Sequence, residues 1–133
     1  MRSLGNGRLL AFDVEKQCAT LEFDAHVDMC HSGNVVQGGF VTGWIDSAMA
    51  HAAMLATEGA MAPSSLEIKV SFLRPANPGV VRAEGWVVRL GRSIAFLEGR
   101  LLNAAGELVA TCTSTAKMVP TQRPGPDPQL VRR

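Results

Sequence analysis

The spacing of hydrophobic and polar positions changes along the chain, and these changes predict an order of elements. Two short apolar stretches, Leu9–Phe12 and Cys18–Phe23, flank the turn at residues 14–17 and predict two strands. Residues 24–36 have no clear period, so we expect a loop there. Residues 1–7 are short and polar, and we expect them to be frayed.

Residues 39–57 predict one long helix. Its apolar side chains fall in adjacent pairs four positions apart, and alanines fill much of the rest. These pairs are Phe40/Val41, Trp44/Ile45, Ala48/Met49 and Ala52/Ala53. A helix that is apolar on most sides is expected to be buried on most sides. Gly59 supplies a stop after it.

After the helix the period changes to two, which is typical of strands. In residues 65–75, apolar and polar side chains alternate; the apolar ones are Leu66, Ile68, Val70 and Phe72. Three more strands are predicted at Val80–Leu90, Ile94–Leu102 and Leu108–Val119. The turns between them are short and favour antiparallel pairing. The pattern therefore predicts an α+β fold in which an antiparallel β-sheet wraps around one long central helix.

Length and composition fit a single domain. The chain has 133 residues, of which 47% are hydrophobic and 19% charged. We assign residues 1–119 to the domain and expect the Pro-rich residues 120–133 to be disordered. A net charge of +1 gives no electrostatic footprint for nucleic acid. An uninterrupted apolar stretch of about 18 residues is missing, so we expect no membrane segment.

The compartment follows from the cysteines and the N-terminus. The chain has three cysteines and no CxxC pair, so neither a zinc site nor a disulfide framework is expected, and no residue is predicted to bind a metal. The first residues lack the long apolar region of a signal peptide. We therefore expect a cytoplasmic protein.

Asp46 is an acid in the middle of the most apolar helix. It cannot cap that helix, and burying an unpaired carboxylate is costly. A structural role, as the partner of a basic residue at an edge, is one explanation, and a catalytic role is the other. Thr42, one turn earlier on the same face, is a candidate to hold the carboxylate. His51, five positions later, lies about 140° away around the helix and is a poor partner.

Gln37-Gly38-Gly39 come immediately before the helix or at its start. Glycines here allow close approach of another backbone or a ligand. A helix start also exposes unpaired N–H groups and a partial positive charge. Together these features can bind the oxygen of a polarised carbonyl group, as an oxyanion hole does. A plain tight turn into the helix is the alternative.

The stretch from His31 to Ala53 resembles the hotdog-fold acyl-CoA thioesterases of the phenylacetate-pathway type, within the 4-hydroxybenzoyl-CoA thioesterase superfamily. That family has an Asn, then His-Gly-Gly six residues later, then an Asp eight residues after the first Gly. The corresponding residues here are His31, Gln37-Gly38-Gly39 and Asp46. Residues 65–79 and 106–119 also look like the family. His31 and Gln37 depart from its usual Asn and His.

The resemblance implies the role of each site residue. The amide of Gly38 or Gly39, with His31, would polarise the thioester carbonyl group, and Asp46 would attack it or activate water. Ser65 matches a family Ser or Thr that orients the water. Substrate contacts are expected from Asn34, Gln37 and Thr42, and coenzyme A phosphate contacts from three arginines that could equally be solvated: Arg74, Arg89 and Arg92. Asp46 would then lie in an apolar acyl tunnel, with its pKa raised by desolvation.

The implied function is hydrolysis of an aryl- or medium-chain acyl-CoA, with no cofactor beyond the coenzyme A of the substrate. Two other functions on the same fold stay open. One is a non-catalytic acyl-CoA or lipid-binding module, for which a buried acid has no use. The other is a hydratase or dehydratase, which would use both a His and an acid.

The helix geometry predicts a shared site. Gly38 and Asp46 are eight residues apart, or about 12 Å along a helix. Both must lie within about 3–3.5 Å of one thioester to react, and one helix cannot meet that requirement. Two helices related by a two-fold axis can, so we expect a homodimer or homotetramer with sites at the dimer interface.

Overall fold

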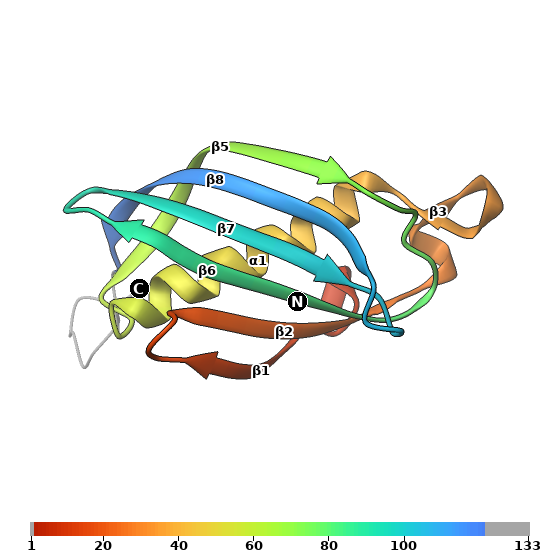
Figure 1. Cartoon of the computed structure of the whole chain (residues 1–133), viewed down its shortest axis with the longest axis horizontal. Helices are drawn as coiled ribbons and strands as arrows, with labels where there is room; N and C mark the ends of the chain where they lie inside the picture. Colours follow the sequence, from red (N-terminus) through yellow and green to blue (C-terminus); the bar gives the residue numbers. More distant parts are fainter. Residues whose placement is uncertain (1, 122–133) are drawn as a thin grey trace, which may run out of the picture.

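A computed structural model describes residues 2–121 of the chain, and its elements follow the predicted order (Figure 1). Short 3-10 turns precede the helix: η1 (Arg2–Leu4), η2 (Val27–Met29) and η3 (Ser32–Asn34). The helix is α1 (Gly38–Ala56). The strands are β1 (Arg8–Asp13), β2 (Cys18–Ala25), β3 (Cys30–His31), β4 (Val35–Val36), β5 (Met61–Phe72), β6 (Gly79–Leu90), β7 (Ile94–Leu102) and β8 (Leu108–Pro120).

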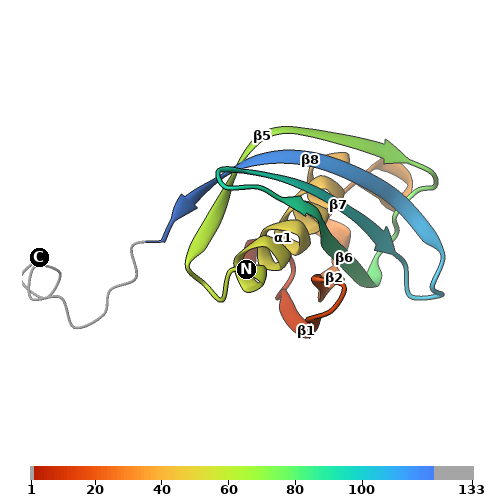
Figure 2. The same ribbon diagram turned by 60° about the vertical axis from the view of Figure 1, so that its left-hand side comes forward.

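Six of these strands form one antiparallel sheet in the order β1-β2-β6-β7-β8-β5. The sheet curves around α1, which lies across its concave face (Figures 1 and 2). This arrangement is the hotdog fold, and it confirms the predicted α+β class. β3 and β4 pair separately beside the start of α1. The predicted boundaries of the helix and of the β6, β7 and β8 strands differ from the observed ones by at most one residue.

Two glycines allow α1 to lie close to the sheet. Gly85 of β6 and Gly99 of β7 are directly paired. A Cβ atom on Gly85 would overlap the backbone of Ala48 and Met49, at 2.5 Å from the Ala48 carbonyl carbon. One on Gly99 would stand 2.6 Å from the Ile45 side chain. Any larger residue at these positions would push the helix away from the sheet.

The N-terminal residues are ordered, so the prediction that they fray is wrong for residues 2–7. Leu4 packs against α1 at Gly43, and the Trp44 indole N–H donates a hydrogen bond of 2.6 Å to the Leu4 carbonyl oxygen. The Gly5 carbonyl accepts a hydrogen bond of 2.8 Å from the Asp24 N–H. These contacts join residues far apart in sequence, so the local pattern could not predict them.

Two further predictions are corrected at their boundaries. Residues 24–36 are not one loop: β2 continues to Ala25, and the rest holds η2, β3, η3 and β4. The predicted tail starts too early, because β8 includes Pro120 and the Thr121 N–H donates to the Ala60 carbonyl. Residues 122–133 of that tail lie outside the described part of the chain.

The alternation in β5 is interrupted by a bulge. Ser65 pairs with Ala116, and Glu67 pairs with the next residue, Thr115, so Leu66 has no partner across the ladder. Leu66 is 61% exposed, which contradicts the regular alternation read from the sequence. The extra residue turns Ser65 toward α1, where Ile68 also points.

We expect Gly85→Ala to destabilise the protein by about 1–3 kcal/mol or more, because its Cβ atom meets backbone that has no room to move. Gly43→Ala is the matched control: it faces only the end of the Leu4 side chain at 3.4 Å. That change should be neutral or should stabilise by up to about 1 kcal/mol through helix propensity. Urea unfolding of both variants measures the difference, and equal stabilities would contradict the close-contact interpretation.

Candidate active site

The first candidate element is the start of α1. Gln37 caps the helix in extended conformation, with φ −61° and ψ 142°, and its carbonyl accepts from the Phe40 N–H. Among residues 2–121, the Gly38 and Gly39 N–H groups make no hydrogen bond. Nothing lies within 4 Å of the place where a Gly39 Cβ atom would stand. Two free donors at the positive end of a 19-residue helix are suited to an anionic or polarised oxygen.

A pocket of about 480 Å³ opens beside these donors. Gly38, His31 and Val36 form one side of it, and Phe72 and residues 73–76 form the other. The two sides are fixed together by the Val36 N–H, which donates to the Ala76 carbonyl at 2.8 Å. His31 is exposed. The structure therefore brings His31 and Gly38 to one pocket, as the sequence predicts.

The second candidate element is Asp46, in the middle of α1. Its carboxylate is half-buried and accepts a hydrogen bond of 3.4 Å from the Ser65 hydroxyl group on β5. Burial raises the pKa of Asp46, and the bond from Ser65 opposes the rise. No ion pair to Asp46 occurs within the described chain. The resemblance implies that Ser65 lies near the acid and orients the water; the structure places its hydroxyl group on the carboxylate itself. The raised pKa agrees with the expected effect of desolvation.

Two of the three thiol groups, those of Cys18 and Cys112, are poor nucleophiles. Burial raises the pKa of Cys112 to about 11, and the nearby Asp46 carboxylate adds to the rise. Burial also raises the pKa of Cys18. Because the thiolate is the reactive form, neither group is a nucleophile at neutral pH. Asp46 remains as the carboxylate suited to that role.

Asp46 and Gly38 are not assembled within one chain. They lie eight residues apart on the same helix, and Asp46 does not line the pocket beside Gly38. The apolar pocket of one chain lies at the start of α1, apart from the Asp46 of that chain. One chain thus holds the donors at one place and the acid at another.

The remaining predicted residues have separate positions. The Thr42 hydroxyl donates to the Gly38 carbonyl at 2.9 Å, so the predicted bond from Thr42 to Asp46 is wrong. A β-hydroxyl group four residues after a helical carbonyl satisfies that carbonyl locally. The Asn34 carbonyl accepts from the Asn77 side chain at 2.9 Å. Gln37 is exposed and makes no side-chain cap.

The three predicted arginines do not form one group. Arg74 lies at the rim of the pocket, but it forms an ion pair of 3.0 Å with Glu107 and donates to the Leu108 carbonyl. Arg89 and Arg92 lie at the other end of the sheet, at the β6–β7 turn near the last turn of α1 (Figure 1). A phosphate contact from Arg74 would have to compete with Glu107.

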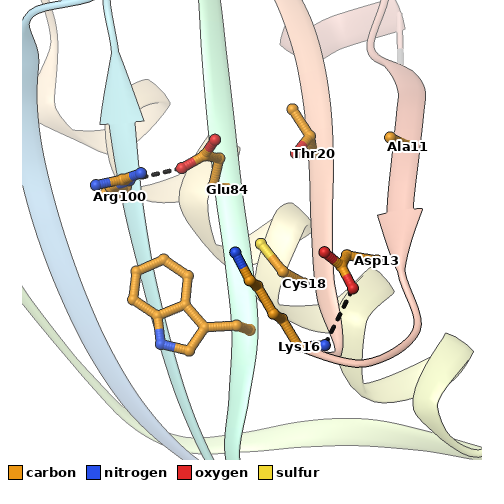
Figure 3. A pocket seen from close by; sticks show the side chains of 8 residues that line it. Ala11, Asp13, Lys16, Cys18, Thr20, Glu84 and Arg100 are labelled. Atoms are coloured by element: carbon orange, nitrogen blue, oxygen red, sulfur yellow. Dashed lines mark hydrogen bonds and ion pairs between the residues drawn. The ribbon is translucent and has the colours of Figure 1, made fainter.

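A second hollow, of about 490 Å³, lies on the outer face of the sheet and contains none of the predicted residues (Figure 3). Its lining includes Cys18, Trp86 and the ion pair of Glu84 with Arg100, at 2.6 Å. This hollow has no free amide donors of a helix start, and its main charges neutralise each other. We therefore place the candidate site at α1.

Sequence reasoning missed two residues of the candidate site. In the sequence, Phe72 and Cys112 both look like ordinary strand residues. Phe72 is half-exposed because β5 is an edge strand, and its ring lies beside Gly38. Cys112 faces α1 near Asp46. Only the pairing of β5 with β8 brings these residues to the helix, so no local signal could have identified them.

Residues 2–121 give no sign of two other kinds of site. No three His, Cys, Asp or Glu side chains in this range come together in a way that could hold a metal ion. No helix in the same range combines the length and hydropathy of a membrane-spanning segment.

Asp46→Asn is expected to raise the thermal unfolding midpoint at neutral pH, because it removes a charge that burial disfavours. Since the pKa of Asp46 is raised, the folded protein binds this proton more tightly than the unfolded chain does. The wild type therefore loses stability as pH rises from about 4 through the raised pKa. The advantage of Asp46→Asn should grow over that window and be small below it.

Thermal melts of both proteins at acid and neutral pH measure this effect, with Asp28→Asn, at an exposed acid, as control. An Asp46→Asn variant that is no more stable than wild type at neutral pH would contradict the costly-carboxylate interpretation.

Several known proteins are similar to this chain in sequence or in structure. A Saccharolobus solfataricus protein whose name proposes an esterase is 31% identical over 74% of this chain and 69% of its own. A phenylacetic acid degradation-related protein from Ralstonia eutropha JMP134 superposes with a TM-score of 0.78 and 31% identity, covering 84% and 83% of the two chains. The phenylacetic acid degradation protein PaaI of Thermus thermophilus, in a mutant form, gives a TM-score of 0.75 and 27% identity over 88% and 96%. The Thioesterase superfamily model matches residues 33–110, more than half of the sequence, and the chain belongs to that superfamily.

Proposed function

We propose that this protein is an acyl-CoA thioesterase that hydrolyses an aryl- or medium-chain acyl-CoA to the free acid and coenzyme A. One observation carries the proposal: a member of the Thioesterase superfamily has two free amide donors at the start of α1 and a half-buried carboxylate without a cation on the same helix. Donors and acid are the two groups that thioester hydrolysis needs.

Each group has a defined part in the reaction. The Gly38 and Gly39 N–H groups donate to the carbonyl oxygen, where negative charge develops during attack. As a general base, Asp46 takes a proton from water while the water oxygen bonds to the carbonyl carbon, and the carbon–sulfur bond then breaks. As a nucleophile, Asp46 would bond to the carbonyl carbon and expel the coenzyme A thiolate, which gives a mixed anhydride; water then hydrolyses it to the free acid and the Asp46 carboxylate. Ser65 holds the carboxylate in place for either route.

Two other functions on this fold are less well supported. A non-catalytic acyl-CoA carrier would gain nothing from a carboxylate whose burial opposes its charge. A hydratase would use a histidine beside the acid, and within one chain His31 lies at the start of α1, apart from Asp46. In the shared site proposed below the two would approach each other, so addition of water to an enoyl-CoA is tested below. The His51 Nδ1–H donates to the Ser47 carbonyl at 2.8 Å, one turn back along the helix.

The proposed site is shared between two copies of the chain. β5 is an edge strand of 12 residues that, among residues 2–121, pairs only with β8. Ser65, near its start, holds Asp46, and Phe72, at its end, touches Gly38. Antiparallel pairing of two β5 strands about a two-fold axis would bring the start of one to the end of the other, and so Asp46 toward the partner's glycines. This pairing would also cover an exposed edge.

The remaining proposals concern the leaving group and the compartment. Arg89 and Arg92 have no ion pair within residues 2–121, whereas Arg74 is occupied by Glu107. The first two arginines are thus the better candidates for coenzyme A phosphates. All three cysteines are free, which supports a reducing, cytoplasmic location.

The test of the function is hydrolysis of acyl-CoA thioesters, followed by free-thiol release. We expect Asp46→Asn to lower kcat by about 10²-fold or more and to leave binding nearly unchanged, because Asn keeps the size but loses the base. Asp28→Asn should keep full activity. If Asp46→Asn retains more than about a tenth of the wild-type kcat, the role of Asp46 is wrong.

The same panel separates the rivals. A wild type that binds acyl-CoA but releases no thiol would favour the carrier, and one that adds water to an enoyl-CoA would favour the hydratase.

Complementation tests the shared site. Gly38→Pro removes one donor, and proline is tolerated at the first position of a helix. Gly38→Ala is its control, because it keeps the donor and its Cβ atom meets the Phe72 ring in the same way, at 3.1 Å. Asp46→Ala removes the acid. Each homodimer should be inactive, but after the two are unfolded and refolded together in equal amounts, half the dimers are mixed and each has one intact site. Roughly a quarter of wild-type activity should return.

Both variants must first fold and dimerise alone, and exchange is checked with two affinity tags. A mixture that exchanges subunits and stays inactive would refute the shared site.

A further inference from the structure

Phe72 stands beside the donors of the candidate site, although the core does not need it there. Its ring Cζ atom lies 3.1 Å from the position that a Cβ atom on Gly38 would take. Phe72 is 56% exposed as a residue, so it contributes little to the core. It forms part of the same pocket as Gly38 and His31. An aromatic side chain thus limits the space next to the amide that would hold a carbonyl oxygen.

The chemistry of this pocket suits a hydrocarbon group. Apart from His31 and Arg74, its side chains are apolar. The Arg74 guanidinium at the rim is already paired with Glu107 at 3.0 Å and bonded to the Leu108 carbonyl at 2.9 Å. A pantetheine arm carries two amides and leads to phosphates, so it needs hydrogen-bond partners and free cations. The pocket offers few of either, whereas an acyl chain needs only apolar contact.

We propose that the acyl group of the substrate lies in this pocket and that Phe72 is the residue that determines its size. This inference rests on the proposed thioesterase function and deepens it. With the carbonyl oxygen on the Gly38 and Gly39 amides, the acyl substituent extends between the 31–38 segment and the end of β5, against the Phe72 ring. This pocket is open on one side, and its apolar lining leaves room for an acyl substituent larger than an acetyl group.

Phe72 also explains why position 38 is glycine. A methyl group there would meet the ring at 3.1 Å, and either the ring would move or the pocket would narrow. Gly39, by contrast, faces open space, and a Cβ atom there would meet nothing within 4 Å. The two glycines therefore differ in the room for a side chain: Phe72 limits it at Gly38, whereas at Gly39 only a bound substrate would limit it.

The test is the specificity of Phe72→Ala and Phe72→Leu. Activity is measured on straight-chain acyl-CoA thioesters from butanoyl to dodecanoyl and on phenylacetyl-CoA. Removing the ring should raise kcat/KM for the longest chains relative to the shortest by about tenfold or more, because one methylene already changes discrimination by that order. Phe72→Leu should change the same ratio in the same direction by less.

Two controls separate specificity from other roles. Val88→Ala removes a comparably exposed apolar side chain on β6, far from the pocket lining, and should leave the ratio unchanged. The ratio of kcat/KM for a coenzyme A thioester to kcat/KM for an N-acetylcysteamine thioester of the same acyl group should be unchanged in both Phe72 variants. The reason is that the thiol part of the substrate does not bind in this pocket. Sedimentation velocity compares the oligomeric state of each variant with that of the wild type.

Three results would overturn the inference. The Phe72 variants change kcat/KM by the same factor for all acyl groups, they change the preference between coenzyme A and N-acetylcysteamine thioesters instead, or they change the oligomeric state. Failure of the proposed function has a different signature, because the wild type then hydrolyses no thioester at all. In that case, non-hydrolysable alkyl-CoA thioethers are titrated against the same variants. The inference stands if Phe72→Ala shifts their Kd ranking toward long chains and falls if it does not.

Discussion

The close contact of α1 with the sheet at Gly85 and Gly99 sets the geometry of the whole protein. Because neither glycine carries a side chain, the helix backbone at Ala48 and Met49 rests directly on β6. That contact fixes both the depth of the helix and its rotation about its own axis. With Ile45 against Gly99, the next residue, Asp46, faces β5, where Ser65 reaches it. The position of the acid is thus decided by two residues with no functional group.

The candidate site has two kinds of group that each lack a usual partner within the described chain. The start of α1 has N–H donors without acceptors, and the middle of α1 has a carboxylate without a cation. Each would be costly in a finished protein interior. A substrate carbonyl group placed between such elements supplies an acceptor to the donors and an electrophile to the acid. Within residues 2–121 the donors have no acceptor and the carboxylate has no cation, which is common at functional sites.

The sequence predicted most of the architecture because its signals are local. The paired apolar residues of α1 and the alternation in the strands gave the helix and the sheet class, and the spacing of Gly38 and Asp46 gave their separation on one helix. Contacts between distant segments were not predictable: Leu4 with Trp44, Phe72 with Gly38, and the local bond of Thr42 that displaced its expected partner. No periodicity encodes such contacts, because each depends on how finished elements pack.

The bulge in β5 has a consequence for how this site could arise or be lost. In a regular strand, Leu66, Ile68 and Val70 would share one face, and Ser65 would point away from α1. The single extra residue reverses the parity of the strand upstream of it, so a hydroxyl group rather than an isobutyl group meets Asp46. Deleting Leu66 would keep that parity, whereas any change that flattens the bulge would put leucine against the acid. The chemistry at Asp46 therefore depends on the bulge taking up the extra residue. With all residues present, loss of the bulge turns Ser65 away from the acid, whereas loss of the extra residue itself does not.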